Sequence, residues 1–214
     1  MKNPSNLGFH DRYVNNRILE CLSRPQYVYS CGLTSLTCVV NFLWSHKLGI
    51  ITQEVLARQL GFDAKRSGEE SPGNRTILDW FRKFRAIYHL SGTEDMLLDR
   101  ESFPALNSVG YEKMVVNVKR TVRSKDTILI HHTANHYNIV CGYFEAAEKP
   151  DEAYKKDVFV KRWLLLAEHY DGNNEGPIDS IRFRDLRKAL RDKDYGVLRF
   201  SSKGEKEDWA PRHM

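Results

Sequence analysis

The sequence lacks an apolar run that approaches the roughly 20 residues needed to cross a bilayer. Residues 1–6 also lack the apolar core of a secretory signal peptide. The four cysteines show no CxxC spacing; they are Cys21, Cys31, Cys38 and Cys141. Without a secretion signal we expect reduced thiols, no membrane partner, and a cytoplasmic location that extends to the nucleus as well.

Positive charge exceeds negative charge only slightly. The chain has 33 Lys and Arg against 28 Asp and Glu, a net charge of +5, and the charges are interspersed. This balance permits an acidic partner without requiring one. Basic stretches lie at 113–125 and 182–199, but the second alternates Arg with Asp, which is typical of a solvated helix face. We therefore expect no nucleic-acid partner.

What the chain does contain is enough apolar material for a core, with 41% hydrophobic and 11% aromatic residues among 214. No repeat, low-complexity tract or linker divides it, so we expect one domain over 1–214 with flexible tails at 1–8 and 201–214. Helices in the first half and strands in the second predict an α+β fold. Residues 91–111 stay unassigned, and 112–124 fit either helix or strand. The expected helices cover 11–22, 31–44, 53–60, 75–84 and 183–190, and the expected strands 127–131, 136–143, 162–168 and 195–200.

The segment 29–44 joins a turn to an apolar helix. Apolar residues between positions 33 and 43 recur at steps of three and four, which places them on one helix face. Ser30 suits the N-cap, so Cys31 falls in the first turn with Gly32 leaving its thiol approachable. Unpaired backbone N–H groups and the helix dipole stabilise a thiolate there. Cys31 is therefore a candidate nucleophile, and the alternative is a core cysteine.

A cysteine nucleophile needs a histidine within hydrogen-bonding reach. Among eight histidines we favour His136, because it opens a strand whose same-face neighbours Asn138, Val140 and Gly142 are small or partly polar. The alternative is an ordinary polar residue at a strand end. The presence of Cys31 favours the interpretation of His136 as a general base.

A third group has to orient the imidazole ring. Glu168 ends the next predicted strand and is the preferred acid. Asp171 and Asn173 lie in the following turn and are alternatives, although that turn also fits a simple solvated loop.

A metal site is a competing interpretation of residues 131–141. His131, His132, His136 and Cys141 supply ligand-type side chains, but in a strand–turn–strand arrangement they need not share a face. We expect no metal and no cofactor.

These residues resemble the papain-like cysteine peptidases, most closely the branch of the double-glycine leader peptidases. The resemblance rests on Gln26, on Cys31-Gly32 opening a long helix, on His136 opening a hydrophobic strand, and on Glu168. It implies a helical N-terminal half packed on a C-terminal antiparallel sheet, and cleavage of an amide bond in a protein or peptide substrate. In that role Cys31 is the nucleophile, His136 the general base, Glu168 (alternatively Asp171) the orienter and Gln26 an oxyanion-hole donor.

Two features depart from that pattern. The family has Asn or Asp where this chain has Glu168, and Gln26 lies five residues ahead of Cys31, a shorter spacing than in papain. The first leaves Glu168 and Asp171 both open, and the second puts the oxyanion role in question.

Other functions on the same fold stay open. The Cys-Gly-Leu-x-Ser-Leu pattern also resembles transglutaminase-like and phytochelatin-synthase-like acyltransferases, and a catalytically inactive binding module with a basic surface is a further alternative. A narrower resemblance, through residues 29–36, is to the basic immunoglobulin-like variable motif-containing proteins. Despite that name, the sequence has no Cys…Trp…Cys immunoglobulin framework.

Overall fold

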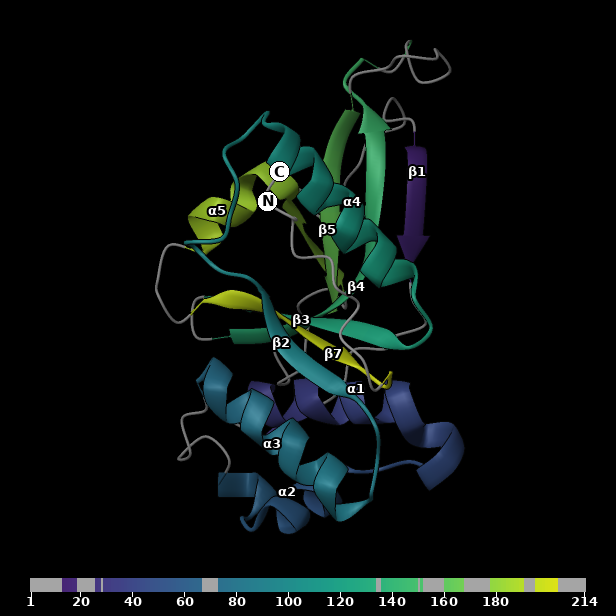
Figure 1. The fold of residues 1–214 in the computed structure, drawn as a ribbon, viewed down its shortest axis with the longest axis vertical. Helices are drawn as coiled ribbons and strands as arrows, with labels where there is room; N and C mark the ends of the chain where they lie inside the picture. The colour runs from purple at the N-terminus through teal and green to yellow at the C-terminus, as the bar shows by residue number, and fades with distance from the viewer. Residues whose placement is uncertain are drawn as a thin grey trace.

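The fold is α+β, with one antiparallel sheet between two groups of helices (Figure 1). This computed structural model describes residues 13–18, 26–27, 29–66, 73–133, 136–149, 151, 160–167, 178–190 and 195–203. The α-helices are α1 (Cys31–Leu48), α2 (Gln53–Leu60), α3 (Asn74–Ile87), α4 (Val109–Arg123) and α5 (Leu186–Ala189), with 3-10 helices at Ala64–Arg66 and Phe183–Asp185. The strands are β1 (Tyr13–Ile18), β2 (Thr93–Leu98), β3 (Thr127–Thr133), β4 (His136–Ala147), β5 (Val160–Ala167), β6 (Ile178–Arg182) and β7 (Gly196–Ser201).

The strand order is β2-β7-β3-β4-β5-β6, and every pairing is antiparallel. β4 is long enough for two strands to share one of its edges, with β3 along 136–140 and β1 along 142–146. Its other edge pairs with β5, where Val140 lies opposite Leu166 and Gly142 opposite Leu165. Cys141 is therefore the extra residue of a β-bulge, which bends β4 and increases its twist.

Helices α1, α2 and α3 cover one face of the sheet, and α4 and α5 cover the other (Figure 1). On the first face Phe81 of α3 packs against Trp44 and Phe200, at ring-centroid distances of 5.4 and 4.9 Å. Residues 31–40 of α1 are all buried, so α1 is the central helix of this layer. The sheet thus fixes the position of the first turn of α1.

Both ends of α2 are formed by residue types that favour helix ends. The Thr52 hydroxyl accepts a hydrogen bond from the Val55 N–H at 3.3 Å, and Gly61 ends the helix in the left-handed region with φ of 98°. The side-chain oxygen of Asn41 accepts a hydrogen bond from the Ile51 N–H at 2.8 Å, and its side-chain N–H donates to the Ile51 carbonyl oxygen at 2.7 Å. These contacts hold the α1–α2 connection.

Several predictions from the sequence were wrong or incomplete. The helix expected at 11–22 is contradicted, because Tyr13–Ile18 is strand β1 paired with β4. Residues 91–111, which the sequence leaves unassigned, contain strand β2. Residues 112–124, which fit either helix or strand, fall almost wholly in helix α4. Asn74 suits the cap of the helix expected over 75–84, but it is the first helical residue of α3 and Gly73 holds the cap position. The charged composition of 145–157 predicts a loop, but β4 runs on to Ala147 and so takes up the start of that segment.

No helix in the described part of the chain is long and apolar enough to cross a membrane.

Candidate functional site

Cys31 is the first residue of α1 and is 8% exposed. Ser30 holds the N-cap position as expected, but its side chain makes no capping bond. Its hydroxyl instead donates to the carbonyl oxygen of Tyr27 at 2.9 Å. The Ser30 side chain therefore does not occupy the backbone N–H groups of the first turn.

The structure brings Cys31 and His136 together. The thiol is hydrogen-bonded with the His136 side chain and with the backbone of Tyr137. Burial alone would raise the pKa of the thiol, but the His136 hydrogen bond, the Tyr137 backbone, the His136 charge and the Gly32 backbone outweigh it. The net result is a Cys31 pKa below its usual value. Such a shift increases the fraction of reactive thiolate.

A second contact between α1 and β4 fixes this geometry. The hydroxyl of Ser35, one helical turn beyond Cys31, donates to the carbonyl oxygen of Tyr137 at 3.1 Å. Ser35 is fully buried. The helix that carries the thiol is therefore attached to the strand that carries the imidazole, next to the site. Sequence reasoning missed Ser35, although it lies four residues after Cys31 on the same helix face.

The neighbouring histidines lie on β3. His131 is opposite Asn138 and His132 opposite Tyr137 in the antiparallel register. The His132 ring stacks on the Tyr137 ring, with centroids 3.9 Å apart and planes within 6°. Cys141 is buried in the core under α1, and the described residues contain no group of three ligand-type side chains placed to hold a metal ion.

The prediction that Asn138, Val140 and Gly142 lie on one face of β4 is only partly confirmed. Val140 packs in the core beneath α4, whereas Tyr137 and Cys141 pack in the core beneath α1. Asn138 therefore shares a face with Val140, as alternation requires. The bulge at Cys141 interrupts this alternation, so Gly142 no longer belongs to that face.

Gln26 lies directly before the turn that leads into α1. That turn is closed by the Ser30 N–H, which donates to the Tyr27 carbonyl at 3.0 Å. The side-chain oxygen of Gln26 is buried and has no hydrogen-bond partner within the described residues. The oxyanion role of Gln26 stays a prediction.

The third group of the expected triad is not described. Glu168, Asp171 and Asn173 all lie outside the described residues. β5 ends at Ala167, which lies opposite Ile139 near the start of β4. The assignment of Glu168 or Asp171 stays a prediction.

Tyr29 has a backbone conformation that side chains rarely adopt, with φ of 59°, and it is 80% exposed. We expect Tyr29→Asn to raise the free energy of unfolding by about 1 kcal/mol, because Asn tolerates this left-handed conformation and little packing is lost. Tyr29→Val should lower it by about the same amount, since β-branched residues are the least tolerant there. Urea unfolding of the three proteins measures both. Equal midpoints would contradict the inferred strain.

The chain is similar to proteins of one family. The family model described as "basic immunoglobulin-like variable motif-containing protein" matches residues 10–207. Proteins of that name from Xenopus tropicalis and Homo sapiens are 32% and 29% identical over 162 and 160 residues, which is 69% of this chain in each case. One from Giardia intestinalis is 25% identical over 158 residues, or 70% of this chain and 57% of its own length.

The chain spans only 32% of the length of the two vertebrate proteins. The names of these relatives state no enzymatic activity, so the wider papain-like resemblance stays a hypothesis. The family match itself extends over most of the chain, from before β1 to beyond β7. The chain therefore belongs to the family of basic immunoglobulin-like variable motif-containing proteins.

Proposed function

We propose that this domain is a papain-like cysteine hydrolase that cleaves an amide bond in a protein or peptide. One observation carries the proposal: the Cys31 thiol, at the N-terminus of a buried helix, is hydrogen-bonded with His136 and has a lowered pKa despite its burial. A structural core cysteine needs neither a histidine partner nor a lowered pKa.

In the proposed reaction the Cys31 thiolate attacks the carbonyl carbon of the substrate amide. The negative charge that develops on the carbonyl oxygen is stabilised by N–H groups at the start of α1, with the side-chain amide of Gln26 as the additional donor. Protonated His136 gives its proton to the departing amine, and the C–N bond breaks to leave a thioester on Cys31. His136 then takes a proton from water, which attacks the thioester and releases the acid. Glu168 or Asp171 orients the ring.

The test compares two cysteines of equal exposure. Cys31 and Cys38 are both 8% exposed, so accessibility alone predicts equal reaction with iodoacetamide. We expect Cys31 to be alkylated at least about tenfold faster near neutral pH, because its pKa is lowered. Mass spectrometry of the digested protein gives the rate at each site.

A peptide vinyl sulfone extends this test to catalysis. We expect it to modify Cys31, and Cys31→Ala to abolish both this labelling and turnover of a fluorogenic peptide substrate. Equal alkylation of Cys31 and Cys38, together with no vinyl sulfone adduct, would falsify the enzymatic proposal. If an added amine captures the acyl group in preference to water, the enzyme is an acyltransferase rather than a hydrolase.

A further inference from the structure

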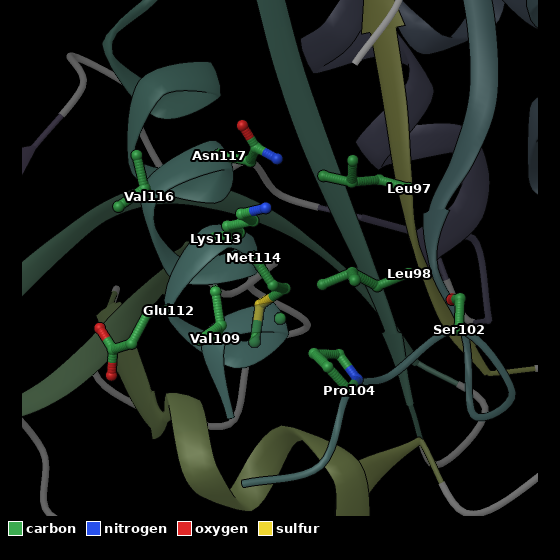
Figure 2. A pocket seen from close by; sticks show the side chains of 11 residues that line it. Leu97, Leu98, Ser102, Pro104, Val109, Glu112, Lys113, Met114, Val116 and Asn117 are labelled. Atoms are coloured by element: carbon green, nitrogen blue, oxygen red, sulfur yellow. The ribbon is translucent and has the colours of Figure 1, made fainter. Parts of the chain in front are cut away.

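An apolar cavity of about 670 Å³ opens on the α4 face of the sheet (Figure 2). Leu97 and Leu98 of β2, together with Pro104, lie across it from Val109 and Met114 of α4. The volume falls within the range of about 300–1,000 Å³ that is usual for ligand pockets. Its lining is suited to apolar groups.

Several apolar side chains of this cavity and its surroundings are largely exposed. Val109 and Val116, seven residues apart on one stripe of α4, are 73% and 60% exposed, and Leu106 just ahead of the helix is 45% exposed. Single exposed apolar residues are ordinary, but here Val109 and Val116 line this cavity and Leu106 lines a second cavity beside it. An occupant that covers all three side chains spans both cavities, which favours a polypeptide segment over a small molecule.

The second cavity, of about 320 Å³, adjoins the first, and Glu112 lines both. Arg162 is engaged within the protein, because it donates to Glu112 at 2.9 Å and to Glu145 at 3.1 Å. The charged side chains that line this second cavity are four cations and two carboxylates: Lys161, Arg162, Arg182, Arg184, Glu112 and Glu148.

Two of the three arginines in this lining lack a carboxylate partner in the described part of the chain. Within the described residues, neither Arg182 nor Arg184 forms an ion pair. Arg182 lies over the Trp163 ring, with its guanidinium carbon 5.3 Å from the centroid, and this leaves the hydrogen-bonding edge of the guanidinium for a ligand. Arg184 is exposed. The second cavity therefore suits carboxylates.

We propose that this α4 surface, made of both cavities with Val109 and Val116, binds an acidic and apolar segment of a partner protein. Apolar side chains of the segment fill the larger cavity and cover the valines, and its carboxylates pair with Arg182 and Arg184. The net charge of +5 favours an acidic partner over a second copy of this chain. The α4 surface lies on the opposite face of the sheet from α1, so this inference is independent of the proposed function (Figure 1).

The probe is a fluorescein-labelled peptide in which Leu and Glu alternate, measured by fluorescence anisotropy on the full chain at physiological salt. We expect saturable binding of this peptide and none of a Leu–Lys counterpart. The double variant Arg182→Glu/Arg184→Glu should raise its Kd roughly tenfold or more, because attraction at two sites becomes repulsion. Val116→Asp should raise Kd roughly tenfold, because it places a carboxylate in the apolar contact.

The controls make the same chemical changes elsewhere. Arg187→Glu/Lys188→Glu reverses two exposed charges on α5 outside both cavities, and Ile50→Asp alters an apolar residue that is 72% exposed beyond α1. We expect each to change Kd by less than about twofold. The absence of saturable binding, or an equal loss in the control variants, overturns the proposal. A dimer in sedimentation that Val116→Asp dissociates also overturns it, in favour of a second copy as the occupant.

Discussion

Replacing His136 with alanine is expected to raise the pKa of the Cys31 thiol and to slow its alkylation by about tenfold at pH 7. Burial opposes ionisation of the thiol, and this opposition largely persists in the variant. The variant loses both the hydrogen bond and the positive charge of the imidazole, which lower the pKa in the native protein. Below its pKa, a thiol loses about tenfold in thiolate fraction for each unit that the pKa rises, although a more basic thiolate reacts somewhat faster.

The measurement is the rate of iodoacetamide reaction at Cys31 from acidic to alkaline pH. The midpoint of the native protein should lie below that of an ordinary thiol, and the His136→Ala midpoint should lie above the native one. His46→Ala is the matched control, because His46 is an exposed histidine near the other end of α1. Superimposable profiles for the native protein and His136→Ala would show that the imidazole does not set the ionisation of Cys31.

The Cys31 and His136 positions could be predicted because local signals converge on each. The apolar repeat after Cys31 specifies a buried helix, and a turn ahead of it fixes where the helix begins. His136 begins the second of two strongly apolar strands, which pair antiparallel with Thr133 opposite His136. What the sequence could not supply is the attachment through Ser35, since this bond depends on how α1 lies across β4.

The failures have one physical origin, which is pairing at long range. Residues four apart, such as Val14 and Ile18, share a face in a helix and also in a strand, so their spacing could not exclude strand β1. Strand β2 has no clear alternation, and it is defined by its register with β7, where Glu94 lies opposite Phe200. Tertiary pairing decides such segments, whereas intrinsic preference is weak.

Glu145→Ala is expected to lower the free energy of unfolding by about 3–5 kcal/mol, because it leaves buried cations without their carboxylate. The Glu145 side chain is 8% exposed. It accepts hydrogen bonds from Lys119 of α4 at 2.7 Å and from Arg162 of β5 at 3.1 Å. The two cations are themselves mostly buried, at 16% and 24% exposure, so water cannot fully replace the lost partner. Urea unfolding measures the change.

Glu112→Ala is the matched control for this network. Glu112 also accepts a bond from Arg162, at 2.9 Å, but its side chain is 52% exposed. Removing it should cost no more than about 1 kcal/mol, because exposed ion pairs contribute little and Arg162 keeps Glu145. Burial of the carboxylate, rather than the presence of an ion pair, is thus expected to set the cost. Equal losses in the two variants would mean that Glu145 holds α4 on the sheet no more firmly than a surface contact does.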